Sequence, residues 1–144
     1  MRVIGLDYGT KTVGVAVSDE MKLIAQPLLT IERKQANKLR QTYAAIEKII
    51  EEQDVELIVL GYPKNMNNTE GERAQATNEF KEALERRTGL QVVLVDERLT
   101  TVEADRILED TGVAKSSRKE HIDKMAAAII LQNYLDVEYN KTHS

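Results

Sequence analysis

Three short apolar runs open the chain, at residues 3–6, 13–17 and 23–31. Only a few Gly, Thr and Lys residues separate the first two, and this pattern is typical of a β-hairpin. Pro27 interrupts the third run. Because proline lacks the amide donor of a sheet ladder, the third strand is predicted to lie at a sheet edge.

Beyond residue 35 the apolar positions alternate between helical and strand patterns. Helical spacing predicts a first helix over about 35–53 and a last helix from 117 to about 136. Between them, capping boxes at Thr69 and Thr100 predict helices that end near Gly89 and Gly112, and Ser117 carries a third capping box. Continuous apolar runs at 55–60 and 91–95 predict buried, parallel strands.

The predicted order is βββ-α-β-α-β-α-α, an α/β fold with a five-stranded mixed sheet flanked by helices. We expect one domain over residues 1–138 and a frayed tail over 139–144. Ligands of such sheets gather beyond the carboxyl ends of the parallel strands. Asp7, the loop 61–68 and the pair Asp96-Glu97 all fall at that edge.

Composition narrows the chemistry of this edge. The 144 residues contain no Cys and two His, which excludes disulfides, thiolate catalysis and Cys-ligated zinc. No apolar segment has the length of a membrane span and no signal-peptide pattern is seen, so we expect a soluble cytoplasmic protein. The net charge of −4 does not indicate a nucleic-acid-binding protein, and any basic surface that binds nucleic acid must be local.

Three carboxylates are the candidate chemistry. Asp7 closes an interior strand, Glu97 follows another strand, and helical spacing turns Asp123 toward the sheet. Converging carboxylates repel one another unless a cation neutralises them, and all-oxygen ligation suits Mg²⁺ or Mn²⁺. A pair of such ions can promote phosphodiester hydrolysis. Singly, each carboxylate has a structural explanation: a turn cap, a solvated strand end and a first-turn helix acid, respectively.

Four sequence blocks together resemble the YqgF family of pre-16S rRNA nucleases, which is also described as Holliday-junction-resolvase-like. They are Gly5-Leu6-Asp7-Tyr8-Gly9-Thr10-Lys11 with 14–19, residues 59–67 with Gly71, Asp96-Glu97-Arg98-Leu99-Thr100-Thr101, and residues 123–132. The blocks occur in order and span nearly the whole chain. The chain departs from the family pattern at Asn68, where Gly is frequent, and at Thr12, where Arg is frequent.

The resemblance implies a ribonuclease H-like fold and a divalent-metal active site. The acidic positions of the family fall on Asp7, Glu97 and Asp123, which are predicted to be both the catalytic residues and the metal ligands. We expect two Mg²⁺ or Mn²⁺ ions, with Asp7 as the bridging ligand because it comes from the central strand. The departure at Thr12 is expected to remove one phosphate contact.

Basic residues are predicted to line the approach of a nucleic acid to these ligands. They are Lys11, Lys64, Arg73, Arg98, Lys115, Arg118, Lys119 and Lys124. For each of them taken alone, solvated surface charge is the simpler explanation.

The predicted function is metal-dependent endonuclease cleavage in the 5′-end maturation of pre-16S rRNA, by a monomer or weak homodimer. A resolvase of four-way DNA junctions and a non-catalytic module that binds pre-ribosomal RNA are the alternatives. One lobe of an actin- or sugar-kinase-type ATPase is a weaker rival, because the chain has no second lobe to clamp a nucleotide.

Overall fold

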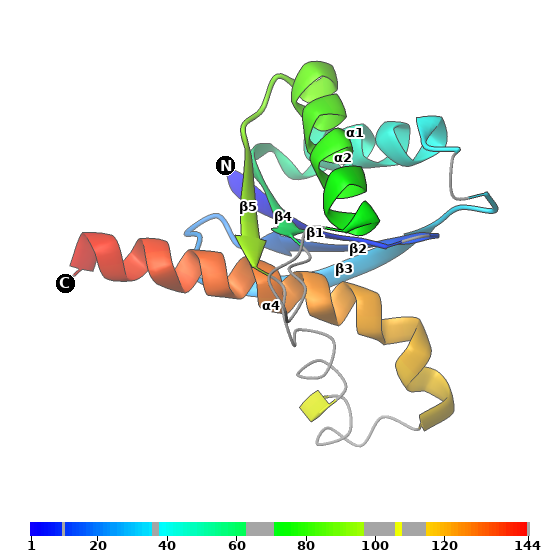
Figure 1. Ribbon diagram of the computed structural model, residues 1–144. Coiled ribbons are helices and arrows are strands. Elements are labelled where there is room, and N and C mark those ends of the chain that lie inside the picture. The colour runs from blue at the N-terminus through cyan, green and yellow to red at the C-terminus, as the bar shows by residue number, and fades with distance from the viewer. Residues whose placement is uncertain (10, 36–37, 63–70, 97–105, 108–114, 144) are drawn as a thin grey trace.

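The protein is built on one five-stranded sheet with strand order β3-β2-β1-β4-β5, as the computed structural model shows (Figure 1). The structure describes residues 1–9, 11–35, 38–62, 71–96, 106–107 and 115–143, with side chains for these except 72, 115–121 and 143. The strands are β1 (Arg2–Tyr8), β2 (Thr12–Ser18), β3 (Ala25–Glu32), β4 (Val55–Tyr62) and β5 (Val92–Asp96). The helices are α1 (Arg40–Gln53), α2 (Glu72–Thr88) and α4 (Lys115–His143).

Strand pairing confirms the predicted mixed sheet. β1 pairs with β2 in antiparallel and with β4 in parallel orientation, and β4 pairs with β5 in parallel. β3 pairs with β2 alone and lies at the sheet edge, as Pro27 predicted. Opposite Pro27 the register shifts between Val15 and Ala16, because proline offers no amide to the ladder.

Two helix starts differ from the prediction. α1 begins at Arg40 rather than near residue 35, because the first helical bond runs from the Tyr43 amide to the Leu39 carbonyl. α2 begins at Glu72 with Gly71 as its N-cap and no side-chain capping bond, two residues after the start that a capping box at Thr69 predicts. Thr69, the predicted cap, lies outside the described residues. The predicted stop at Gly89 is confirmed, with φ 72° in the left-handed region that glycine adopts readily.

α4 is longer than predicted at both ends. It starts at Lys115, so Ser117 lies within the helix, and it continues past Asp136 to His143. The segment predicted as a frayed tail forms its last turns. There Lys141 pairs with Glu138 at 3.2 Å, and the Thr142 hydroxyl donates to the Tyr139 carbonyl at 3.0 Å. The helix predicted from Thr100 lies outside the described residues, apart from a helical pair at 106–107.

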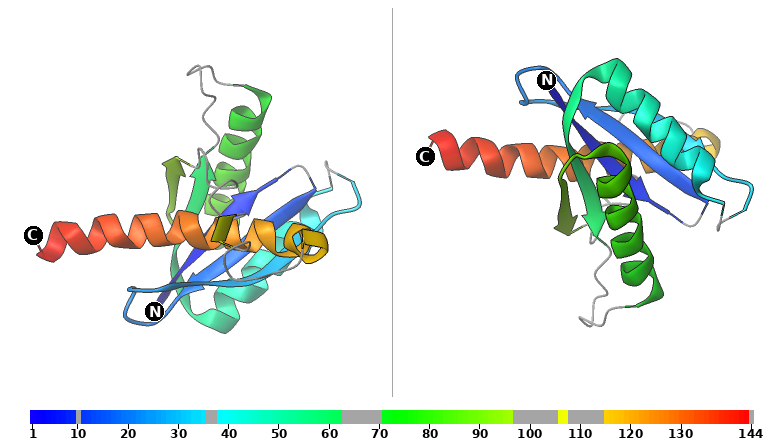
Figure 2. Two further views of the ribbon diagram at one scale, coloured as in Figure 1. Left: turned by 90° about the horizontal axis from the view of Figure 1, so that it is seen from below. Right: turned by 90° about the horizontal axis from the view of Figure 1, so that it is seen from above.

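Helices cover both faces of the sheet. α1 and α2 lie on one face, and α4 crosses the other with its C-terminal end projecting beyond the sheet (Figures 1 and 2). Alternate side chains of each strand pack into the two core layers, since successive side chains point to opposite faces of the sheet. In β1, Ile4 and Leu6 join the core cluster that contains Ile46 of α1 and Phe80 of α2, whereas Val3 packs with Leu131 of α4.

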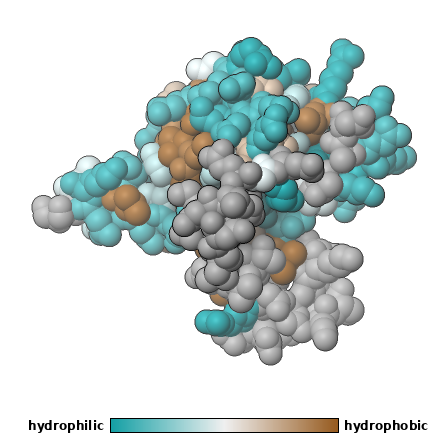
Figure 3. Space-filling view, in the orientation of Figure 1, coloured by the Kyte–Doolittle hydropathy of each residue, from teal (hydrophilic) through white to brown (hydrophobic). Residues whose placement is uncertain are grey.

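The face shown in Figure 3 is mostly hydrophilic, with hydrophobic side chains gathered beside β5 and a smaller spot on the C-terminal half of α4. Val137 and Tyr139 of α4 are among the exposed hydrophobic residues. Among the helices that the structure describes, none combines the length and the apolar character needed to cross a membrane.

Candidate active site

The carboxyl ends of three adjacent parallel strands meet at one edge of the sheet. β4 lies between β1 and β5, and the register pairs Leu6 with Leu60 and Tyr62 with Asp96. Asp7 lies at this edge as the penultimate residue of β1. Glu97 follows the last residue of β5 in the sequence and lies outside the described residues. The predicted gathering of strand ends is therefore confirmed for β1, β4 and β5.

Asp7 belongs to the face of the sheet that α4 covers. Val3 packs in the core cluster of α4, and an added Cβ on Gly5 would lie 2.7 Å from the Cβ of Leu131. Residues two apart in a strand share a face, so Val3, Gly5 and Asp7 form one row beneath the helix. Gly5 lets the helix backbone approach this row closely.

Gly14 brings Asp123 to the same place. It pairs with Asp7 across the β1–β2 ladder, and directly opposed residues of antiparallel strands lie about 5 Å apart. An added Cβ on Gly14 would lie 2.0 Å from the backbone oxygen of Asp123. The helix backbone at Asp123 therefore rests on the strand neighbour of Asp7, in space that only glycine leaves open. Two of the three predicted ligands thus come together on one face, at one sheet edge.

Thr12 holds the side chain of Asp123. Its hydroxyl donates a hydrogen bond to Oδ2 of Asp123 at 2.8 Å, linking residues 111 positions apart in the sequence. In the sequence, Thr12 is notable only because the family frequently has Arg at this position. In the fold it limits the rotation of a half-buried carboxylate and directs the free lone pairs of that carboxylate.

Aromatic packing and two arginines support the strand end beyond Asp7. Tyr8 points to the opposite face and stacks on Phe80, with ring centroids 4.0 Å apart and planes 5° from parallel. Arg73 of α2 donates to the Tyr8 carbonyl at 2.9 Å, and Arg33 donates to the Gly9 carbonyl at 2.8 Å. Tyr43 of α1 also stacks on Phe80, and burial raises the pKa of its hydroxyl. Asp7 therefore lies on a strand end that both helices of the far face hold in place.

The predicted basic residues fall into two groups. Lys11 is exposed in the β1–β2 turn, Lys124 is half-buried beside Asp123, and Arg73 contacts the end of β1 as described above. Lys64 and Arg98 lie outside the described residues. Lys115, Arg118 and Lys119 belong to the first turns of α4, and their side chains also lie outside the described set.

The donor set at this edge suits a hard divalent cation. Asp7 and Asp123 offer carboxylate oxygens, which Mg²⁺ and Mn²⁺ prefer. Among the described residues no group of three or more His, Asp or Glu side chains could hold a metal ion. The third predicted ligand, Glu97, is not part of that set, so the three-carboxylate centre remains a prediction.

Sequence reasoning did not identify the roles of three residues that shape this site: Thr12, Gly14 and Arg33. In the sequence Gly14 stands out only as part of a motif, and its spacing from Gly5 across a hairpin could have indicated a close helix approach. Arg33 is 8% exposed and lies over the Tyr8 ring at 5.2 Å from its centroid. No local sequence signal distinguishes a buried arginine of this kind from its exposed neighbour Lys34.

Comparisons with known proteins agree with this architecture. The family model RuvX, described as Holliday junction resolvase, matches residues 1–137. A protein of Lachnospira eligens is 62% identical over 136 residues, covering 94% of this chain and 97% of the relative. A protein of Agathobacter rectalis is 60% identical over 136 residues, covering 94% of this chain and 95% of the relative. Both bear the name "Putative pre-16S rRNA nuclease".

Among solved structures, Thermus thermophilus RuvC in complex with a Holliday junction substrate matches with a TM-score of 0.62 at 16% identity. That match covers 97% of this chain and 96% of the RuvC chain, and it shows a shared fold. A second T. thermophilus RuvC structure matches with a TM-score of 0.58 at 14% identity, covering 97% of both chains. Together with the family-model match and the curated relatives, these findings confirm the family and the fold that the motifs predicted: this chain belongs to the RuvX family.

Proposed function

We propose that this protein is a divalent-metal-dependent endonuclease that hydrolyses phosphodiester bonds in the maturation of pre-16S rRNA. The observation that carries the proposal is the meeting of Asp7 and Asp123 across Gly14, at the carboxyl edge of the sheet. In a member of the RuvX family, this pair supplies the oxygen ligands that such chemistry needs.

Asp7, Asp123 and Glu97 would hold two Mg²⁺ or Mn²⁺ ions, with Asp7 as the shared ligand. Ions bound there would supply the positive charge that polarises the scissile phosphate and offsets the charge that develops during hydrolysis. The two described carboxylates come from a central strand and a long helix. Rigid elements of this kind hold ligands more accurately than loops do.

The residues around the carboxylates position them and the substrate. Thr12 fixes the orientation of Asp123 through its hydroxyl. Arg73 holds the backbone that follows Asp7, since its guanidinium donates to the Tyr8 carbonyl. Lys11 lies in the turn that follows the strand of Asp7, and Lys124 follows Asp123 in α4. Their charges would attract the phosphates of an incoming strand.

RNA is the substrate that we favour. The curated relatives that match at 60% identity or more carry the name of a pre-16S rRNA nuclease. A ribosomal RNA precursor as substrate would place the activity in the cytoplasm. The net charge of −4 disfavours indiscriminate binding, so recognition would rest on local basic surfaces.

The test is cleavage of an end-labelled precursor 16S rRNA fragment by the purified protein with Mn²⁺ or Mg²⁺. Asp7→Asn is assayed in parallel and is expected to leave the RNA uncut, with thermal unfolding used to verify that the variant folds. Equal cleavage by both proteins would assign the activity to a contaminant and refute the proposed active site.

A four-way DNA junction is the second candidate substrate. The family description names a Holliday junction resolvase, and the fold is that of RuvC. Paired cuts in a junction require two active sites, so this alternative predicts a symmetric dimer during cleavage. Cleavage of a synthetic junction without cleavage of the RNA would favour it. Metal-independent RNA binding without cleavage of either substrate would instead favour the non-catalytic module.

A further inference from the structure

A second concave site lies between the end of β3 and the start of α1. The cavity has a volume of about 720 Å³. Its lining includes Arg33, Lys34, Lys38, Arg40 and Thr42, which we call the basic pocket. None of these five residues was among the predicted nucleic-acid contacts or metal ligands, and Arg33 also contacts the strand end beside Asp7.

The basic pocket concentrates positive charge in an acidic protein. Residues 32–40 contain four Lys or Arg and one acid, Glu32, whereas the whole chain has a net charge of −4. Lys34, Lys38 and Arg40 are exposed, and within the described part of the chain no ion pair joins them to a carboxylate. Their charges are therefore available to an anionic ligand. On a surface where positive and negative side chains alternate, they would not be.

The start of α1 adds backbone donors to this charge. Leu39 is the N-cap and makes no side-chain capping bond, and the first turn holds no acidic residue. The first amides of a helix have no partners within the helix, and the helix dipole favours an anion beside them. Thr42, in the same turn, lines the pocket although it is only 1% exposed. The described part of the chain supplies no hydrogen-bond partner for its hydroxyl.

Arg33 links the basic pocket to the strand end beside Asp7. Its Nη2 donates to the Gly9 carbonyl at 2.8 Å, and its backbone amide donates to the Lys11 carbonyl at 2.7 Å. Glu32, the last residue of β3, pairs with Thr12, whose hydroxyl holds Asp123. The pocket and the carboxylates therefore lie at the same edge of the sheet but on opposite faces, since the pocket is on the α1 face and Asp7 and Asp123 are on the α4 face.

The spacing suits one continuous strand of nucleic acid that passes around the sheet edge. β3 lies two strand spacings from β1, roughly 10 Å. Backbone phosphates advance by about 3.4 Å per nucleotide along a stacked strand, so roughly 10 Å corresponds to about three nucleotides, and the path around the sheet edge from the α4 face to the α1 face adds to this minimum. A strand that places one phosphate at Asp7 and Asp123 could place another in the basic pocket by passing around this edge.

We propose that the basic pocket binds a backbone phosphate of the RNA strand, at least about three nucleotides from the bond cut at the carboxylate site. This inference rests on the proposed nuclease function for its substrate. Its chemistry is a phosphodiester held by Lys38, Arg40 and the first amides of α1, with the buried Thr42 hydroxyl as an additional donor.

The test measures RNA binding rather than cleavage. Lys38→Gln/Arg40→Gln is made in the Asp7→Asn background, and its affinity for a 20-nucleotide RNA is measured without metal at several salt concentrations. We expect affinity to fall on the order of tenfold. The slope of log affinity against log salt should flatten by about 0.7 for each phosphate that the variant no longer neutralises. Thermal unfolding verifies that the variants fold.

The matched control is Lys48→Gln/Lys141→Gln, which changes the net charge equally at exposed sites on α1 and α4. It is expected to bind like the Asp7→Asn parent. If the pocket variant also binds like the parent, or if the control is weakened as much, the basic pocket is not a phosphate site.

A methylphosphonate scan locates the bound phosphate. Replacing one phosphate of the RNA by a neutral methylphosphonate should weaken binding to the parent at one position, at least about three nucleotides from the cut, and should have no further effect on the pocket variant. Equal weakening in both proteins at every position would refute the inference. Pocket-dependent binding without RNA cleavage by the wild type would refute the nuclease proposal alone, so the two failures are distinguishable.

Discussion

The two ends of the sheet use carboxylates in opposite ways. Asp19 follows β2 at one end, and its Oδ1 accepts the amides of Leu23 at 2.8 Å and Ile24 at 3.0 Å, four and five residues later. At the other end Asp123 accepts its hydrogen bond from Thr12, which is 111 positions away. The Asp19 carboxylate accepts hydrogen bonds from the amides of its own turn, whereas the Asp123 carboxylate is positioned by the packing of a helix on a sheet.

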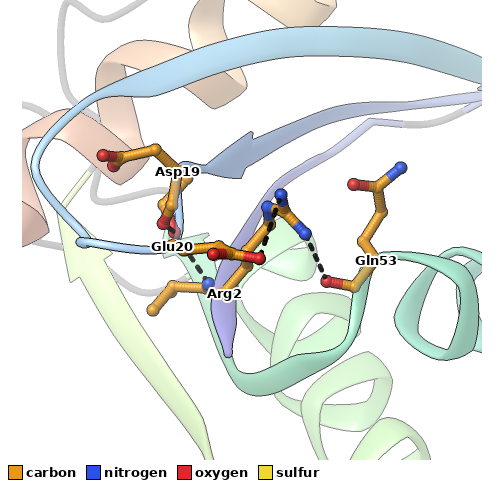
Figure 4. Close-up of polar contacts among 6 residues, drawn as sticks. Arg2, Asp19, Glu20 and Gln53 are labelled. Atoms are coloured by element: carbon orange, nitrogen blue, oxygen red, sulfur yellow. Dashed lines mark hydrogen bonds and ion pairs between the residues drawn. The ribbon is translucent and has the colours of Figure 1, made fainter.

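The end that holds Asp19 is closed by ordinary structural contacts (Figure 4). Arg2 pairs with Glu20 at 3.7 Å and donates to the Gln53 carbonyl at 3.3 Å. Lys22 pairs with Glu56 nearby. Exposed pairs of this kind contribute little to stability, typically below about 1 kcal/mol. An Asp at a strand end is therefore an indicator of function only when its partners come from distant elements.

The largest expected effect comes from changing a carboxylate at the active edge. Asp123→Asn should lower RNA cleavage by about 10²–10³-fold, because removing one preorganised electrostatic group from an active site costs that much. Asp136→Asn changes the same residue type near the other end of the same helix and should retain activity. Single-turnover cleavage with Mn²⁺ measures both. Equal reductions in cleavage by the two variants would show that α4 tolerates no change of charge. Asp123 would then have no special role at the active edge.

Gly14→Ala tests the close approach that joins the two carboxylates. Its Cβ would meet the Asp123 backbone oxygen at 2.0 Å, so α4 must shift. We expect a decrease of about 1–3 kcal/mol in the free energy of unfolding, as in other overpacked sites, together with a decrease in cleavage.

Gly89→Ala is the control for Gly14→Ala. It strains a φ of 72° where no atom lies within 4 Å of the added Cβ, and it should cost about 1 kcal/mol with cleavage retained. Urea unfolding and cleavage are measured on both proteins. Full activity in Gly14→Ala would mean that the helix need not rest on β2.

A smaller effect is expected when Thr12 is replaced by a residue of similar volume that cannot donate a hydrogen bond to Asp123. Thr12→Val lacks the hydroxyl that orients the carboxylate, and removing a group that orients a metal ligand lowers affinity or activity by about 10–100-fold. Thr12→Ser keeps the donor and should restore most of the Mn²⁺ affinity, measured by isothermal titration. If the Thr12→Val and Thr12→Ser proteins bind Mn²⁺ equally well, Thr12 has only a packing role.

The smallest effect concerns acid stability at the Asp19 end. The amides of Ile24 and then Leu23 lower the pKa of Asp19 below its usual value of 3.8. A carboxyl group with a lowered folded pKa stabilises the fold above its unfolded pKa, and this contribution disappears as pH falls below about 3.8. In Asp19→Asn this part of the acid destabilisation should be absent. Urea midpoints between pH 6 and 2.5 measure it, and identical profiles would show that the turn does not depend on the charge.

The basic pocket illustrates the limit of charge counting along the chain. Residues 32–40 hold four Lys or Arg and one acid, whereas residues 115–124, which sequence reasoning selected, hold four Lys or Arg and two acids. Only the register of β3 against β2 showed that Glu32 ends beside Thr12, at the active edge. Charge density along a sequence carries no information about which sheet edge a loop occupies.

The sequence by itself determined the strands, their mixed order and the edge position of β3, because hydrophobic alternation and Pro27 act within a few residues. It also placed the ends of β1, β4 and β5 at one edge, since parallel strands impose that outcome. The family followed from the motifs that hold Asp7, Glu97 and Asp123.

The tertiary structure alone decided how those residues meet. The bond from Thr12 to Asp123, the contact of Asp123 with Gly14 and the anchoring of the β1 end by Arg33 and Arg73 all join distant segments. Such contacts depend on how closely α4 and α2 pack on the sheet. That closeness is a property of paired surfaces, which no local pattern of residues encodes.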